Sequence, residues 1–155
     1  MKDALALRSR PLTVLRPMLA PAHDLGPCPV GRRKTVPVVG GTFDGERLRG
    51  EILPEGGDWA FMRPDDVLEL DVRLTLKTHD GALIHCTYRG VRHGPPEVVA
   101  ALTRGEDVDP AAYYFRIVPR FETSAPAYQF LNRIVAVGVG ARRPSGPEYS
   151  IHEIL

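Results

Sequence analysis

The chain has 155 residues, which is the size of one ordinary domain and enough to enclose a hydrophobic core. Its apolar fraction of 43% and charged fraction of 25% are typical of a globular protein and argue against a disordered chain. The formal net charge of +1 gives no electrostatic basis for binding nucleic acid or an anionic membrane, so we expect neither as a partner.

The first part of the chain predicts strands separated by turns. We expect residues 1–11 to form an N-terminal tail and residues 12–19 the first strand, followed by a Pro- and Gly-rich loop over 20–33. Residues 35–43 predict a strand in which Gly40-Gly41 marks a bulge or sharp bend. Residues 46–53 and 58–62 predict two further strands, separated by the loop Pro54-Glu55-Gly56-Gly57.

The dipeptide Asp80-Gly81 carries the clearest structural signal. It separates two stretches of alternating character, residues 69–77 and 82–90, around which we expect the strands 67–77 and 82–89. Asp-Gly between two segments of period two is among the strongest short-range indications of a β-hairpin. We therefore predict a hairpin here, with Gly81 at positive φ.

The last third of the chain continues the pattern. Only residues 97–103 have helical spacing, and 126–132 predict a single helical turn. Residues 111–122, 133–140 and 148–154 predict strands, with Pro119 expected at a bulge. The resulting fold class is all-β, a single antiparallel β-barrel of about eight strands over residues 12–155 with one or two short helical turns. Such a barrel removes its sheet edges and can hold one small ligand.

The sequence predicts a cytoplasmic protein without cofactor or metal. No apolar stretch is long enough for a membrane span, and Arg8 and Arg10 interrupt the start before a signal core could form. Two cysteines, Cys28 and Cys86, do not make a disulfide framework. The histidines are scattered without ligand spacing, and the glycine-rich segments lack a phosphate-binding motif.

An ordered set of short motifs resembles one protein family. The motifs are Gly40-Gly41, Gly50, Gly56-Gly57-Asp58-Trp59, Asp80-Gly81-Ala82-Leu83-Ile84, Arg89-Gly90, Tyr113-Tyr114-Phe115-Arg116, Phe121-Glu122 and Tyr128-Gln129-Phe130-Leu131-Asn132-Arg133. In this order, over 12–155, they resemble the bacterial and fungal family catalogued as domain of unknown function 3237. Phe130 stands where the family pattern has Trp. The resemblance implies a small antiparallel β-barrel and no established reaction.

Asp58-Trp59, directly after two glycines, is the first candidate site. Glycines let a ligand approach the backbone, and Trp offers a flat apolar wall with one hydrogen-bond donor. The alternative is structural, an Asp that caps a turn and a Trp in the core.

The strand through Tyr114 is the second candidate. Alternation places Tyr114, Arg116, Arg120 and Glu122 on one face, but it does not say whether that face lines the barrel or meets water. In the functional interpretation, Arg116 binds a carboxylate at the barrel mouth.

The first functional hypothesis is a barrel that binds a small carbonyl- or carboxylate-bearing molecule and acts on it by cofactor-free acid–base chemistry, as an isomerase or cyclase would. The expected catalytic groups are Asp58 or Glu122 as base and Tyr88 or Tyr114 as acid, and the expected ligand-binding groups are Trp59, Arg116 and Asn132. We expect all seven to converge on one concavity.

A second hypothesis is a non-catalytic carrier or sensor, and a third is a barrel whose outer faces serve self-association into a homo-oligomer. A carboxyl group of raised pKa inside the cavity would favour the enzyme.

Overall fold

The computed structural model describes residues 5–155 and confirms the all-β fold. Residues 1–4, part of the expected N-terminal tail, lie outside the described residues. The strands are β1 (Ser9–Leu19), β2 (His23–Cys28), β3 (Gly31–Asp44), β4 (Gly50–Ile52), β5 (Gly56–Met62), β6 (Leu68–Thr78), β7 (Leu83–His93), β8 (Tyr114–Glu122), β9 (Ala136–Arg143) and β10 (Gly146–Ile154). The helical segments are α1 (Pro96–Thr103) and two short 3₁₀ segments, η1 (Pro110–Ala112) and η2 (Pro126–Arg133).

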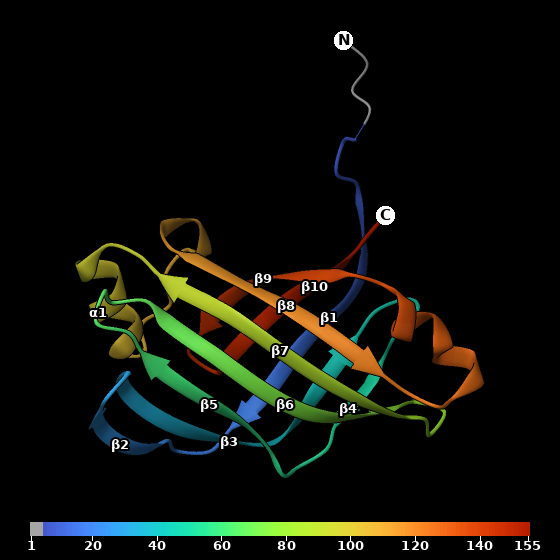
Figure 1. Cartoon of the computed structure of the whole chain (residues 1–155), viewed down its shortest axis with the longest axis horizontal. Helices are drawn as coiled ribbons and strands as arrows, with labels where there is room; N and C mark the ends of the chain where they lie inside the picture. Colours follow the sequence, from blue (N-terminus) through green and yellow to red (C-terminus); the bar gives the residue numbers. More distant parts are fainter. Residues whose placement is uncertain (1–4) are drawn as a thin grey trace.

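The strands close into an antiparallel barrel (Figure 1). Its circuit runs β1-β10-β9-β8-β7-β6-β5-β3 and returns from β3 to β1. β4 and β2 are additional strands. β4 lies between β3 and β6 like β5, but it pairs with the opposite halves of those strands. Two short strands therefore share one position in the wall.

The β6–β7 hairpin forms as predicted. Its ladder runs without interruption from Leu68↔Arg92 to Lys77↔Leu83, and Gly81 in the turn has φ +89°. A bulge is also present directly before the predicted Gly40-Gly41, because the β1–β3 register passes from Met18↔Gly40 to Leu19↔Val38 and skips Val39.

Three local predictions are wrong. Residues 20–33 are not all loop, because β2 pairs with the first residues of β3; β2 is an edge strand, where proline and glycine are tolerated. Of residues 46–53, only Gly50–Ile52 pair in a strand. Pro119 makes no bulge, since the β7–β8 register continues through Tyr88↔Pro119. β9 pairs with β8 only at Arg116 and Ile117, so Pro119 removes no bond from that ladder.

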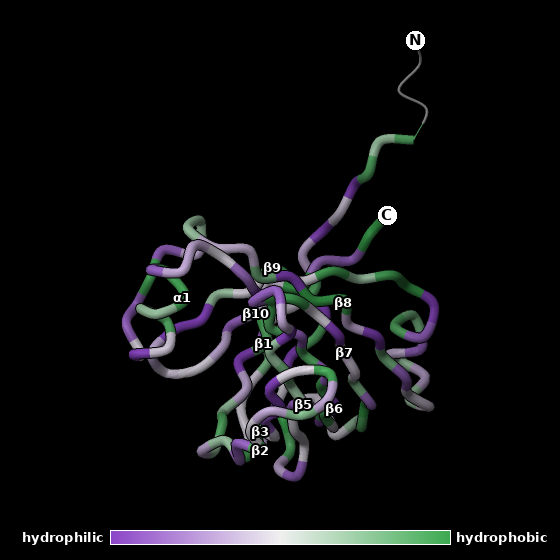
Figure 2. The backbone as a smooth tube through the Cα atoms, turned by 60° about the vertical axis from the view of Figure 1, so that its left-hand side comes forward, coloured by the Kyte–Doolittle hydropathy of each residue, from purple (hydrophilic) through white to green (hydrophobic). Residues whose placement is uncertain are grey.

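Alternation along the strands sorts side chains between the barrel interior and the outside. Figure 2 shows the resulting change between hydrophilic and hydrophobic residues along the tube. The interior differs between the two ends of the barrel. One end, beside η2, is filled by buried side chains that include Leu15, Phe43, Leu48, Leu76 and Ile84. The other end, beside α1, is hollow.

Candidate functional site

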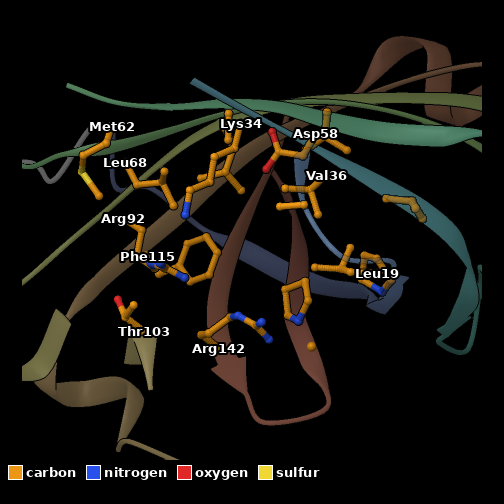
Figure 3. A pocket seen from close by; sticks show the side chains of 18 of the residues that line it. Leu19, Lys34, Val36, Asp58, Met62, Leu68, Arg92, Thr103, Phe115 and Arg142 are labelled. Atoms are coloured by element: carbon orange, nitrogen blue, oxygen red, sulfur yellow. The ribbon is translucent and has the colours of Figure 1, made fainter. Parts of the chain in front are cut away.

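A cavity of about 620 Å³ occupies the barrel end beside α1 (Figure 3). Its volume lies within the range of small-molecule sites. Aliphatic and aromatic side chains from the strands form most of the wall, among them Val36, Val38, Leu70, Val72 and Phe115. The β1–β2 connection, α1 and the β9–β10 turn border it. The cavity therefore has a largely apolar wall that also carries several charged and polar side chains.

Asp58 is the acidic residue of this wall. β5 carries it opposite Val36 of β3 and Val72 of β6. The register would next place Trp59 opposite Asp71, but no pair forms there. Instead the Asp71 N–H donates to Asp58 Oδ1 at 2.9 Å. The carboxyl group thus replaces a ladder contact and is held in a fixed orientation at the cavity.

Burial raises the pKa of the Asp58 carboxyl from 3.8 to about 6. The hydrogen bond from Asp71 and the positive charge of Arg92 oppose this rise, and the negative charge of Asp71 adds to it. A carboxyl with a pKa of about 6 is mostly ionised at pH 7 yet more basic than an ordinary Asp. It is suited to accept and return a proton.

Two tyrosines lie beside this carboxyl. Tyr88 and Tyr149 line the cavity, and their rings meet edge to face with centroids 5.3 Å apart. Burial raises the pKa of Tyr88 well above 10 and also raises that of Tyr149. Asp58 is near enough to contribute to both pKa increases. At neutral pH the site therefore combines an ionised carboxylate with two neutral phenol groups that can donate hydrogen bonds.

Four basic side chains complete the polar lining, namely Arg32, Lys34, Arg92 and Arg142. Arg32 pairs with Asp24 at 2.8 Å. Among residues 5–155, no carboxylate forms a salt bridge with the other three. Figure 3 shows Lys34, Arg92 and Arg142 around the same space as Asp58. The cavity consequently holds more positive than negative charge.

The expected convergence of seven residues on one concavity is wrong. Asp58 and Tyr88 line the cavity, whereas the other five candidates do not. Tyr114 and Glu122 are exposed on the outer face of β8, and Arg116 shares that face with its guanidinium 4.7 Å from the Tyr114 ring centroid. The alternation along β8 was correct, but its inner face carries Phe115, Ile117, Pro119 and Phe121.

Trp59 and Asn132 also lie away from the cavity. Trp59 is 41% exposed, since it follows Asp58 on β5 and so faces outward, where the Arg73 guanidinium lies over its ring. Asn132 exchanges two hydrogen bonds with the backbone of Thr123 and thereby fastens η2 to the end of β8. These contacts are structural in kind.

Sequence reasoning missed Arg92, Arg142, Lys34 and Tyr149. A usable signal existed for Arg92, because residues 88, 90 and 92 share one face of β7. Arg142 similarly shares a face with residues 138 and 140 of β9. Both arginines stand near the end of an inward face, where the barrel opens.

Residues 5–155 meet the requirements of neither a metal site nor a membrane-spanning helix. They contain no group of three His, Cys, Asp or Glu side chains arranged to hold a metal ion. None of the described helices is long and apolar enough to cross a membrane.

Sequence comparison connects this chain to uncharacterised proteins. Residues 8–154 match the model of a family described as protein of unknown function, DUF3237. An UPF0311 protein of Rhodopseudomonas palustris is 40% identical over 125 residues, covering 81% of this chain and 82% of that protein. An UPF0311 protein of Clostridium acetobutylicum is 36% identical over 143 residues, covering 92% and 88%.

Solved structures share the barrel. A conserved protein of unknown function from R. palustris superposes with a TM-score of 0.94 at 34% identity, covering 98% of this chain and all of that one. A β-barrel-like protein from Acinetobacter baumannii gives 0.86 at 38% identity, with both chains fully covered. A protein described as an enzyme from Penicillium herquei gives 0.75 at 17% identity, covering 100% and 99% of the two chains; at that identity the likeness concerns the fold alone.

Proposed function

Because this chain belongs to the DUF3237 family, whose description assigns no function, we propose its function from the cavity itself: it binds a small carbonyl- or carboxylate-bearing molecule in the barrel and moves a proton on it without a cofactor. Asp58 is the base, and Tyr88 with Tyr149 supplies hydrogen bonds to the oxygen on which charge develops. The reaction class is isomerisation or ring closure through an enol or enolate.

The proton transfers balance within the site. The Asp58 carboxylate takes a proton from a carbon next to the ligand's carbonyl group, and the electron pair of that C–H bond moves to the carbonyl oxygen. The neutral hydroxyl groups of the tyrosines stabilise the resulting enolate. Asp58, now protonated, returns the proton at the same carbon or at another carbon of the conjugated system and regains its charge.

The observation that carries this proposal is the position of Asp58. It lies in an apolar cavity, its pKa is raised to about 6, and it neighbours two phenols that stay protonated when it is ionised. Titratable groups whose environments separate their pKa values are typical of acid–base sites. A carrier that only holds its ligand has no need of such a carboxyl. A cavity of this size also counts against a barrel that serves only self-association.

Deuterium exchange in D₂O tests the proposal directly. The probe is 2-tetralone, a bicyclic ketone with acidic C–H groups beside its carbonyl. We expect the protein to accelerate incorporation of deuterium from D₂O, with a rate that rises with pH through about 6 as Asp58 ionises and then levels off. Mass spectrometry or proton NMR measures the exchange.

The matched variants separate an enzyme from a carrier. Asp58→Asn keeps the volume and removes the base, so it should lose the acceleration while still binding the ketone. Glu51→Gln, an exposed change on β4, removes one carboxylate elsewhere and should keep the wild-type rate. Binding of the ketone without any exchange in the wild type would favour the non-catalytic carrier.

A further inference from the structure

We infer that the ligand is an organic acid, a ring-sized apolar body with one oxyanion group, and that Arg92 and Arg142 together bind this group. The inference rests on the proposed small-molecule cavity and specifies the ligand's charge and its orientation. It replaces Arg116, which lies on the outer face of β8, as the anion-binding residue.

Arg92 and Arg142 bring positive charge to the cavity wall. Arg92 and Arg142 are half-buried, line one cavity and form no salt bridge with the carboxylates of residues 5–155. Burial and the nearby charge of Arg142 lower the pKa of the Arg92 guanidinium, while the charge of Asp58 opposes this shift. Taking a charge out of water costs free energy unless a partner compensates it. An anion between them would relieve the repulsion.

Within residues 5–155, neither arginine is held in a structural ion pair, and both keep hydrogen-bond donors for a ligand. The Arg92 guanidinium lies 5.7 Å from the centroid of the Phe115 ring, a contact that leaves its N–H donors free for a ligand. Arg142 uses one donor, Nη1, on the carbonyl of Arg143 at 2.7 Å. Its backbone N–H donates to the Tyr113 hydroxyl at 2.8 Å, which fixes the strand beneath the side chain. Guanidinium groups with several remaining donors suit a planar oxyanion such as a carboxylate.

The separation between Asp58 and the two arginines sets the size and the orientation of the ligand. Asp58 lies level with Val72 and Tyr88, while Arg92 is four residues further along β7 toward the mouth. Four residues of a strand span roughly 13 Å. The side chains of Asp58 and Arg92 extend into this distance, and the ligand fills the rest. The wall between them is apolar and includes Leu70 and Phe115. A ligand of one to three rings would thus place its acidic group at the arginines and its reactive carbon at Asp58.

Matched acid and amide pairs test the charge requirement. The probes are benzoate, 2-naphthoate and 9-anthroate, each compared with its carboxamide, with binding measured by isothermal titration calorimetry at pH 7.5. We expect at least one acid to bind tenfold or more tightly than its amide. Arg142→Met should reduce the affinity for that acid at least tenfold and change the affinity for the amide less than twofold. Arg120→Met, an exposed change on β8, removes the same charge outside the cavity and should alter neither affinity.

Each outcome has a defined meaning. Equal binding of acid and amide, or an unchanged affinity in Arg142→Met, overturns the inference and leaves the proposed function intact. If none of the six compounds binds at millimolar concentration, the small-molecule function fails as well. Arg92→Lys is a second variant that keeps the charge and removes the planar fork. It should weaken acid binding while its melting temperature stays close to that of the wild type, which would exclude unfolding as the cause.

Discussion

Replacing Asp58 by asparagine should stabilise this protein at pH 8. The Asp58 carboxyl has a pKa of about 6 in the folded chain and an ordinary value of 3.8. At 1.36 kcal/mol per pKa unit, that difference corresponds to a loss of about 3 kcal/mol in the free energy of unfolding when Asp58 is ionised. The side-chain oxygen of the introduced asparagine can still accept the Asp71 N–H, so the variant loses little hydrogen bonding. We expect a net gain of about 2–3 kcal/mol, or roughly 5–10 °C in melting temperature.

The sign of the pH dependence follows from linkage. The folded-state pKa of Asp58 is raised, so the folded chain holds its proton more tightly than the unfolded chain does. The wild type therefore loses stability, relative to the Asp58→Asn variant, as pH rises from about 4 to about 6, and the difference stays constant above that. Near pH 4 and below, the two proteins should differ little.

Urea denaturation at pH 4 and pH 8, followed by circular dichroism, measures both differences. The variant Glu51→Gln, which changes an exposed carboxylate on β4, serves as the control and should be nearly neutral at both values. Destabilisation of the Asp58→Asn variant at pH 8, or a stability difference that does not change with pH, would refute the reasoning. Paired with lost deuterium exchange, the predicted gain would show that the wild type gives up stability to keep a charged group in its cavity.

Three further changes test other parts of the barrel. Glu153→Gln should lower the free energy of unfolding by about 1–2 kcal/mol at pH 7, because two arginines donate hydrogen bonds to this carboxylate and lower its pKa. This difference from the wild type should disappear as the pH falls below about 4.5, which urea denaturation at several pH values would show. Gly81→Val should lower the free energy of unfolding by about 1–3 kcal/mol through backbone strain at φ +89°, because an added Cβ would meet no atom of residues 5–155 within 4 Å; an unchanged melting curve would contradict it. Gly140→Ala should lower the free energy of unfolding by about 1–3 kcal/mol, since its Cβ would lie 2.6 Å from the Phe115 ring at the cavity wall. It should also weaken binding of the aromatic acids described above, and an unchanged affinity in calorimetry would count against it.

The sequence predicted the hairpin at Gly81 and the barrel because local signals decide them. Asp-Gly fixes a two-stranded turn, and alternation fixes which side chains share a face. Alternation does not decide which face is inside when both carry aromatic residues, as Tyr114 and Phe115 do on β8. The inner face of β8 is set by its neighbours β7 and β9, and those contacts are long-range.

The site was predictable only in part for a related reason. Asp58 stood out because it follows two glycines, and Tyr88 because of its polar group within an apolar run. Arg142 did not stand out, because the predicted strand ended at residue 140, whereas β9 extends to Arg143. It joins the site only because β9 and β10 bring it to the open end of the barrel, about 50 residues after Arg92 in the chain. Which charges form salt bridges is decided by long-range contacts in the folded chain, and the sequence pattern does not contain them.

The division of the barrel into a filled end and a hollow end has a consequence for how such a protein can evolve. Substitutions at Leu76 or Ile84 act on the packed half and would be removed by selection for folding. Substitutions at Val36, Met62 or Leu68 reshape the hollow half, because these wall residues are only half-buried and lie outside the core cluster. Randomising these wall positions should therefore yield folded variants with new ligand preferences, so one scaffold can diversify its chemistry without first acquiring extra stability.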